Sequence, residues 1–536
     1  MVLQHTHDET LDLTRLLSAD SYGDSNYTSH DDDDPAVSLL DNQSARRRYR
    51  PLALITRSFS LSYWRRVQRH AIRRAKRIKP GQAYVSDWPR RLLRLVCVSL
   101  STLLLIVVLV GAFFPSYTRL PPHYQSLRER VENGRRAGSA NTGGQKVYIA
   151  ASIFDPGGDL AGGNWGKNVL DLIHILGPEN VYLSIYENDS GDDALEALSN
   201  LEPRVPCNHT LASEAHLNLK DLPHITLPDG TRRIKRIAYL AEVRNRALRP
   251  LEQAQTRFDR LLYVNDVMFD PVEAAQLLFS TNIDAEGKAQ YRSACAVDFI
   301  NPFKFYDTFA TRDLNGFSMG VPFFPWFSAV GDAVTLEQTL SDNDAVPVRS
   351  CWGGMVAFDA RFLQNWQNEA AKIRTAGNES PSNLTAPYRF RAEKDLWWDS
   401  SECCLIQADI QSSDVTNPGI YMNPYVRVAY DTRTLSWLWL SKRFEKLYTP
   451  IHFIADILVN LPDFNSRRDE TPWHTVQEDV WKDDATKPAN GSWHKVTRTA
   501  KHDGFCGRRG LQVMKEVMSL GDRNWEFIEP PTLSLG

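Results

Sequence analysis

An uncharged run of twenty residues, 95–114, constrains this chain more than any other feature of its sequence. The run is rich in Leu and Val, and as a helix rising 1.5 Å per residue it would cross a hydrocarbon core of about 30 Å. It starts too far from the N-terminus to be the apolar core of a cleavable signal peptide. A buried core helix is the alternative, but such helices rarely contain so many consecutive apolar residues. The sequence therefore predicts one transmembrane helix.

Basic residues gather on one side of this run. Residues 44–94 contain sixteen Lys and Arg but a single acid, Asp87, whereas the twenty residues after the run hold only three Arg. Positively charged flanks stay in the cytoplasm, so we expect a single-pass type II protein with a cytoplasmic N-terminus. The whole chain carries a net charge of -3, which argues against nucleic acid as a general partner.

Composition divides the rest of the chain into segments. Residues 1–45, which include the acidic run 31–34, are typical of a disordered cytoplasmic tail. Residues 46–94 form a basic juxtamembrane segment, which either lies against anionic lipid headgroups or only fixes the topology. Residues 115–145 are rich in Pro and Gly, as a stem linker would be. We expect residues 146–536 to form one globular lumenal domain.

Glycosylation sequons and cysteines agree with a lumenal location. Beyond the apolar run, Asn-X-Ser/Thr sequons occur at Asn188, Asn208, Asn378, Asn383 and Asn490. Asn26 and Asn42 also match, on the side that would not be glycosylated, so sequons alone do not fix the orientation. Six cysteines lie outside the run, and they permit three disulfides in any of fifteen pairings: Cys207, Cys295, Cys351, Cys403, Cys404 and Cys506.

The globular part begins with alternating strand and helix patterns. The apolar run 146–154 precedes a Gly-rich loop and the periodic segment 168–176, and two more apolar runs, 180–189 and 260–270, end in acidic or amide side chains. This alternation predicts an α/β fold with a parallel sheet, which binds ligands at the carboxyl ends of its strands. The Gly-rich loop has neither the spacing of a dinucleotide fingerprint nor a phosphate-loop lysine.

Arg244 stands within the apolar face of a predicted helix. At 100° per residue from Leu240, Arg244 falls between Leu251 and Leu248, inside the apolar arc that also holds Val243 and Ala247. A guanidinium on a buried face needs a partner. It either forms an ion pair with a core carboxylate or clamps a phosphate or a metal-binding acid.

Asp266 follows four apolar residues, 261–264, that are typical of a buried central strand. A carboxylate at the carboxyl end of such a strand, beside a nucleotide site, is how nucleotide-sugar transferases hold a divalent cation. Such an ion prefers hard oxygen ligands, and it neutralises the negative charge of the leaving diphosphate. The alternative is an acid that caps the turn before Pro271.

Several segments together carry a family resemblance. The strings VYIAASIFD, YLAEVRN, LLYVNDVMFDP, RSCWGGMVAFDA and NPYVRVAY, in this order, resemble the fungal capsule-associated and cryptococcal α-1,3-mannosyltransferase group, glycosyltransferase family 69. The resemblance covers residues 146–460. It implies a GT-A-type, Rossmann-like fold, a Golgi membrane anchor, GDP-mannose as donor and a mannose-containing acceptor. It also implies an α product from an α donor, which means retention of configuration.

The metal motif departs from the Asp-X-Asp pattern of the GT-A group. Here the chain reads Asn265-Asp266-Val267, so Asp266 would be the one direct carboxylate ligand of Mn²⁺ or Mg²⁺, with Asn265 assisting. Asp270 could act through a water. Because GT-A enzymes often recruit a late histidine, His452 is the candidate further ligand, preferred over His474 and His494; the alternative is a packed histidine.

Two downstream segments offer candidate sugar-binding and catalytic groups. Gly353 and Gly354 would leave room for a sugar or form a tight turn. Trp397 and Trp398 would supply a stacking face for a sugar or pack in the core.

Asp399 and Glu402, three residues apart, are predicted to share a helical face and to act as the catalytic acids, or else to be solvated. They would steady the transition state or orient the acceptor hydroxyl. A disulfide at Cys403 or Cys404 would hold this site rigidly.

These features together favour a Golgi-anchored, metal-assisted α-1,3-mannosyltransferase. It would act in cell-wall, capsule or glycoprotein synthesis, with Arg244, Asn245, Asn265 and Asp266 on the donor side. The alternative from another class is a catalytically silent, membrane-tethered glycan-binding or assembly protein that keeps the transferase fold. The imperfect Asp-X-Asp motif favours this alternative.

Overall fold

The computed structural model describes most of the chain beyond the basic segment. The described ranges are 88–134, 136–188, 190–214, 222–227, 229–365, 386–414, 416–482, 491–515 and 524–531. The predicted cytoplasmic tail and most of the basic juxtamembrane segment lie outside them. The described residues divide into two compact units, one of residues 88–106 and the other of the described residues from 107 to 531.

The apolar run is helical. Helix α4 (Trp88–Phe113) includes Arg91–Phe113, which contains an 18-residue stretch with a mean hydropathy of 2.8 and is long and apolar enough to cross a membrane. The structure thus gives the predicted segment the length and composition of a membrane span.

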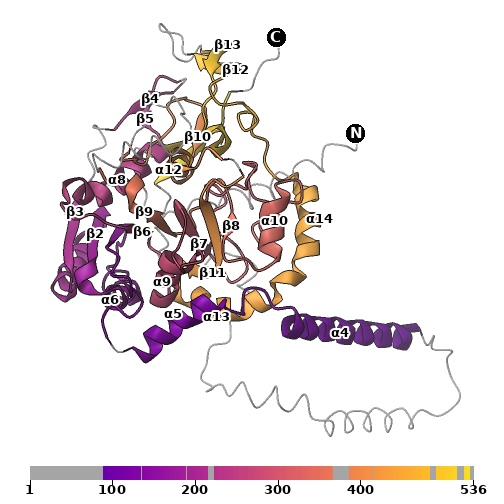
Figure 1. Cartoon of the computed structure of the whole chain (residues 1–536). Coiled ribbons are helices and arrows are strands. Elements are labelled where there is room, and N and C mark those ends of the chain that lie inside the picture. Colours follow the sequence, from indigo (N-terminus) through magenta and orange to yellow (C-terminus); the bar gives the residue numbers. More distant parts are fainter. Residues whose placement is uncertain are drawn as a thin grey trace, which may run out of the picture. The chain divides into compact units, whose positions relative to one another are not determined.

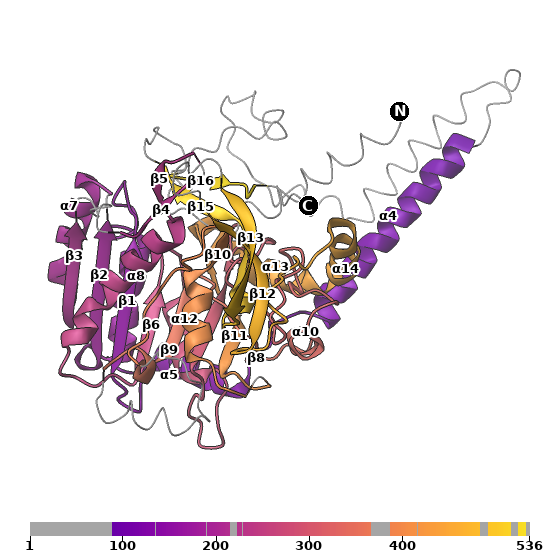
Figure 2. The same cartoon turned by 90° about the horizontal axis from the view of Figure 1, so that it is seen from above.

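The folded part is built on one large sheet (Figures 1 and 2). Its strands are β1 (Val147–Ile153), β2 (Val181–Asn188), β3 (Asn208–Glu214), β6 (Arg260–Val264), β7 (Ser293–Phe299), β8 (Val346–Pro347), β9 (Met355–Asp359) and β11 (Ile420–Ala429). They lie in the order β3-β2-β1-β6-β9-β7-β11-β8. Neighbours pair in parallel except at β9 and β8, so the sheet is mixed rather than wholly parallel as predicted.

Helices cover both faces of this sheet. The sheet helices are α6 (Asn164–Leu176), α8 (Arg236–Gln253), α9 (Pro271–Ser280) and α12 (Glu402–Ile410). Along β1, Ile149 packs into the core layer with α6 and α9, whereas Tyr148 packs into the layer with α8 and α12. This alternation is expected of a strand that is buried on both faces.

Smaller elements complete the unit. Among the described residues, further helices are α5 (Pro122–Asn133), α7 (Asp192–Leu201), α10 (Ala333–Leu340), α13 (Thr432–Ser441), α14 (Thr449–Val459) and the 3₁₀ turns η1 (Pro178–Asn180), η2 (Glu202–Arg204), η4 (Ala360–Phe362), η5 (Lys442–Leu447) and η7 (Gly504–Cys506). Four two-stranded pairs are β4 (His224–Thr226) with β5 (Arg232–Ile234), β10 (Trp398–Ser400) with β14 (Gly507–Arg509), β12 (Thr475–Lys482) with β13 (Ser492–Thr499), and β15 (Leu511–Met514) with β16 (Trp525–Ile528).

The predicted stem linker, 115–145, contains folded structure. Helix α5 (Pro122–Asn133) lies within it, and the side chains of Tyr117, Tyr124 and Leu127 are buried in the core. Pro at the start of this segment is compatible with a helix because the first helical position needs no N–H donor. Part of the segment therefore belongs to the globular unit.

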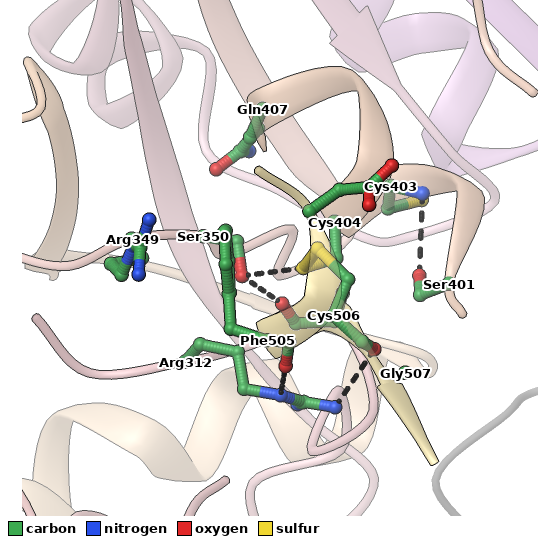
Figure 3. Close-up of a disulfide and its surroundings, with 12 residues drawn as sticks. Arg312, Arg349, Ser350, Ser401, Cys403, Cys404, Gln407, Phe505, Cys506 and Gly507 are labelled. Atoms are coloured by element: carbon green, nitrogen blue, oxygen red, sulfur yellow. Dashed lines mark hydrogen bonds between the residues drawn. A yellow bond between two sulfur atoms is a disulfide. The ribbon is translucent and has the colours of Figure 1, made fainter. Parts of the chain in front are cut away.

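Two disulfides form among the described cysteines. One joins Cys295 to Cys351, and the other joins Cys404 of α12 to Cys506 of η7 (Figure 3). Cys207 and Cys403 remain thiols, so two of the three permitted bridges are present. The second bridge ties the first turn of α12 to the C-terminal segment, 102 residues further along the chain.

Candidate functional site

Polar side chains gather where the parallel strands end. Asn188 ends β2, Asp266 follows β6, Asp298 is the penultimate residue of β7, and Tyr430 follows β11. These strands run in the same direction, so their carboxyl ends meet at one edge of the sheet. The candidate site lies at this edge, as the sequence predicts.

The end of β6 is held from two sides. The backbone N–H of Asn265 donates to the carbonyl of Gly354 at 2.9 Å, and the indole N–H of Trp165 donates to the carbonyl of Asn265 at 2.9 Å. Asp266 is the next residue, and its side chain is half-buried, whereas the strand before it is fully buried. A fixed backbone thus presents one accessible carboxylate at the sheet edge.

Arg244 connects three elements beneath this edge. It is buried on α8, its Nε donates to Glu402 Oε1 at 2.8 Å, and its Nη1 donates to Asn265 Oδ1 at 2.9 Å. The guanidinium also lies 4.5 Å from the centroid of the Trp352 ring. This is the ion pair with a core carboxylate that the helical pattern allowed, and it extends to the residue beside Asp266.

Asp399 and Glu402 do not share a helical face. Glu402 is the first residue of α12 and is completely buried, whereas Asp399 belongs to β10. Asp399 is also buried: its Oδ1 lies 2.8 Å from Lys235 Nζ, and its Oδ2 accepts a 2.6 Å hydrogen bond from the backbone of Gln512. The prediction of a shared helical face is therefore wrong. The helix begins at Glu402, with Ser401 as its N-cap, so Asp399 lies before the helix.

A pair of buried acids, Asp298 and Asp307, was missed by the sequence reasoning. The backbone N–H of Asp307 donates to Asp298 Oδ1 at 3.1 Å, and the Tyr430 hydroxyl donates to Asp298 Oδ2 at 3.0 Å. Burial, reinforced by the charge of Asp307, raises the pKa of Asp298 to about 8. The sequence contains a pattern that predicts Asp298 as a site residue, because Asp298 stands near the end of an apolar run just as Asp266 follows one.

Asp307 links this acid pair to the glycine turn. Its carboxylate accepts from the backbone N–H of Gly353 at 3.3 Å and of Ala310 at 3.1 Å. Burial raises the pKa of Asp307 to about 6; these two hydrogen bonds oppose the rise, and the charge of Glu402 adds to it. Asp307 thus interacts electrostatically with both Arg244 and Glu402.

Gly353 and Gly354 form a tight turn rather than an open space for a sugar. Their φ angles are 58° and 64°, in the left-handed region that favours glycine. A Cβ on Gly353 would lie 2.0 Å from the carbonyl oxygen of Ala296, and one on Gly354 would lie 2.7 Å from Val267. The turn lets the start of β9 meet the end of β6.

Three other predicted ligand-binding side chains pack against other parts of the protein, with Asn245 half-buried and the two tryptophans buried. Asn245 exchanges two 2.9 Å hydrogen bonds with the backbone of Phe390. Trp397 and Trp398 are buried, and the guanidinium of Arg467 lies 4.1 Å from the Trp398 ring centroid. These contacts agree with the core tryptophan pair that was the alternative to a sugar-stacking face.

The residues considered for the metal do not come together. His452 is completely buried, with Nδ1 3.5 Å from Asp456 Oδ2, and burial lowers its pKa to about 4. Asp270 caps α9 by accepting from the N–H groups of Val272 and Glu273. Asp266 is the only residue of the predicted set at the sheet edge whose carboxylate is neither a helix cap nor fully buried. Across the described ranges, no cluster of three or more His, Cys, Asp or Glu side chains could hold a metal ion.

Comparison with known proteins gives one family. The family model described as Cryptococcal mannosyltransferase 1 matches residues 146–409, which confirms the resemblance drawn from the sequence motifs. A search of curated protein sequences finds no significant match.

Two solved structures are distantly similar. One is the mannosyltransferase PcManGT from Pyrobaculum calidifontis in complex with GDP-Man and Mn²⁺, at 9% identity and a TM-score of 0.29, covering 63% of this chain and 80% of that one. The other is mannosyl-3-phosphoglycerate synthase from Rubrobacter xylanophilus, at 10% identity and a TM-score of 0.26, covering 72% and 93%. Similarity of this degree does not identify a fold.

Proposed function

We propose that the protein transfers mannose from GDP-mannose to a mannose-containing glycan, because the family model described as Cryptococcal mannosyltransferase 1 matches residues 146–409. We propose an α-1,3 linkage with retained configuration, in the synthesis of a cell-wall, capsule or glycoprotein glycan. The family match is the observation that carries this proposal. The sheet edge with Asp266, Arg244 and Glu402 supports it, because the match includes all three residues.

Asp266 is the proposed ligand of a divalent cation, Mn²⁺ or Mg²⁺. It fits this role in part, since it offers a hard oxygen donor at the end of a rigid strand, while the donor's two phosphates would supply further oxygens. A bound cation would neutralise the charge that develops on the diphosphate as it leaves. Asp270 and His452 are not part of this proposal, because the first caps a helix and the second is buried beside Asp456.

Arg244 and Glu402 are proposed as positioning residues. Arg244 holds the Asn265 side chain, and so fixes the backbone from which Asp266 projects. Glu402 is completely buried and holds Arg244 in turn, so it acts through the arginine rather than on the sugar. Asp399 has a comparable structural role, because its ion pair with Lys235 joins β10 to the start of α8.

The proposed retention of configuration determines which catalytic groups the site needs. When donor and product are both α, no inverting base is needed, and the departing diphosphate can accept the proton of the attacking hydroxyl on the same face. A two-carboxylate hydrolase would instead need an acid and a nucleophile about 5 Å apart. The half-buried carboxylate of Asp266 at the sheet edge suits the first arrangement.

We also propose that the domain has a GT-A-type fold and lies in the Golgi lumen behind α4. The proposal rests on the family resemblance, on the mixed sheet whose parallel strands end at the site, and on the length and hydropathy of Arg91–Phe113. The excess of Lys and Arg before the helix supports a cytoplasmic N-terminus.

A transfer assay on the full chain in detergent tests the proposed reaction. Labelled GDP-mannose and an α-mannobiose acceptor are supplied with Mn²⁺ or with a chelator, and NMR of the product gives the anomeric configuration. We expect metal-dependent formation of an α-linked mannose. No transfer from any nucleotide sugar by a protein with cooperative unfolding would contradict the enzyme and favour the silent glycan-binding or assembly role.

A further inference from the structure

Helix α14 is amphipathic, but its polar face is buried and its apolar face is exposed. Its two polar side chains in the middle of the helix, His452 and Asp456, point inward and are buried. The outward side carries the aliphatic residues Ile451, Ile454, Ile457 and Leu458, which are 60% to 79% exposed. A helix on the surface of a soluble protein normally buries its apolar side instead.

The apolar surface continues on both sides of α14. Trp437 and Trp439 on α13 are 51% and 61% exposed, and Phe464, five residues after α14 ends, is 88% exposed. Helix α13 leads through η5 into α14, so these side chains come from one continuous stretch of chain. Clusters of large exposed apolar side chains on this scale mark surfaces that contact a partner or a membrane.

The chain enters the folded unit close to this surface. Only Phe114 and Pro115 separate the end of α4 from Ser116, which is buried and donates to Asp342 Oδ1 at 3.3 Å. The other oxygen of Asp342 accepts from Lys446 Nζ of η5 at 3.0 Å. One carboxylate therefore bridges the entry point to the segment that leads into α14.

A second contact fixes the entry point next to α10. The hydroxyl of Tyr117 donates to the carbonyl of Thr339 on α10 at 2.9 Å. Figures 1 and 2 both show α10 beside α14. Since two extended residues reach at most about 7 Å, a membrane span that ends at Phe113 would keep Ser116 near the bilayer surface.

We propose that the outward face of α14, formed by Ile451, Ile454, Ile457 and Leu458, docks into the lipid interface of the leaflet through which the chain emerges. This inference rests on the proposal that α4 spans the membrane. An amphipathic helix of this kind buries its apolar face about 5–10 Å into the headgroup and acyl boundary. The exposed indoles of Trp437 and Trp439 have the amphipathic rings that favour the membrane interface.

Docking would hold the catalytic domain in a fixed orientation. Helix α13 packs against β11, whose carboxyl end contributes to the sheet edge of the candidate site. A lipid contact through α13 and α14 would therefore set the direction in which Asp266 faces relative to the bilayer. This would bring the site to acceptors at a restricted distance from the membrane.

Photo-crosslinking of the full chain in vesicles tests the docking. The photoreactive residue p-benzoylphenylalanine replaces Ile457 or, as the control, Leu195, which is 51% exposed but lies on α7, the helix that leads to the β3 edge of the sheet. Each protein is reconstituted in phosphatidylcholine–phosphatidylethanolamine vesicles, illuminated and analysed by mass spectrometry. We expect at least about tenfold more phospholipid adduct at position 457 than at position 195.

A variant and an extraction step make the result decisive. In a protein that also carries Ile451→Ser, Ile454→Ser and Leu458→Ser, the adduct at position 457 should fall to the level seen at position 195. Equal adducts at both positions, or a cross-link from position 457 to a second copy of the chain, would overturn the proposal. Alkaline carbonate extraction of parallel samples tests the α4 anchor separately, so a failed anchor and a failed docking give different results.

Discussion

At the residue scale, the site depends on one buried cation that satisfies several partners. Arg244 donates to Glu402 and to Asn265, and the Trp352 ring lies under its guanidinium. Because Glu402 is completely buried, its carboxylate is shielded from water and is compensated by this ion pair inside the protein. Arg244 therefore stabilises the fold and positions the strand end that carries Asp266.

Replacing Arg244 by alanine should lower the free energy of unfolding by about 3–5 kcal/mol, because it leaves the Glu402 carboxylate buried without its ion-pair partner. Adding Glu402→Gln to Arg244→Ala should recover part of this loss, since the buried charge is then gone. Denaturant unfolding of the wild type, both single variants and the double variant measures the coupling. Additive losses in this cycle would contradict the account.

The Asp298 carboxyl should make stability fall as pH rises. Its pKa is raised to about 8 in the folded protein, chiefly by burial, against about 3.9 in an unfolded chain. Between these values the folded state keeps a proton that the unfolded state has released, so stability present below about pH 4 is lost progressively up to about pH 8. Asp298→Asn should flatten this dependence, as melting temperatures between pH 5 and pH 8 will show. An equal slope in the variant would refute the assignment.

At the element scale, α5 and the residues before it belong to the folded unit. Tyr117 and Tyr124 are completely buried, and Asn423 donates to the Tyr124 hydroxyl at 2.6 Å. A fragment that starts at Gln125 should therefore unfold more easily than one that starts at Phe114, by at least about 3 kcal/mol, because it lacks both buried rings. Denaturant unfolding of the two fragments decides this. Equal stability would show that residues 114–124 are the linker that their composition suggests.

Local sequence patterns predicted the elements that depend on local periodicity. The 3.6-residue period placed Arg244 on the buried side of α8, and the apolar run 261–264 placed Asp266 at a strand end. The acid Asp298 was overlooked, although the same strand-end pattern precedes it.

The environment of β10 could not be predicted in this way, because distant parts of the chain create it. Asp399 pairs in register with Arg508, and the buried Trp397 packs with Leu511 and Val513. These partners lie more than 100 residues further along the chain. The stretch that reads as one helix with two acids is divided between a strand and a helix for the same reason.

At the scale of the whole molecule, orientation in the membrane decides which sequons meet the glycosylation machinery. Asn208 begins β3 at the edge of the sheet and is exposed, whereas Asn188 is buried and donates to the Tyr239 hydroxyl at 2.7 Å. We expect a glycan on Asn208 and none on Asn188, Asn26 or Asn42. Peptide mapping before and after endoglycosidase treatment measures this. A glycan at Asn26 or Asn42 would contradict the proposed topology, because it would place the N-terminal segment in the lumen.

The central claim is that Asp266, at the end of β6, makes the mannosyl transfer possible. Asp270, four residues later, is the matched control, because it only caps α9. Asp270→Ala should lower stability by about 1 kcal/mol through the lost cap and leave the rate of transfer nearly unchanged.

The most direct measurement is the rate of mannose transfer from GDP-mannose by the full chain carrying Asp266→Asn, set beside wild type and Asp270→Ala. The account predicts a loss of about 100-fold or more for Asp266→Asn, with an unchanged melting temperature, because the carboxylate that would hold the charge-neutralising cation is gone. Transfer at the wild-type rate by a folded Asp266→Asn protein would contradict it.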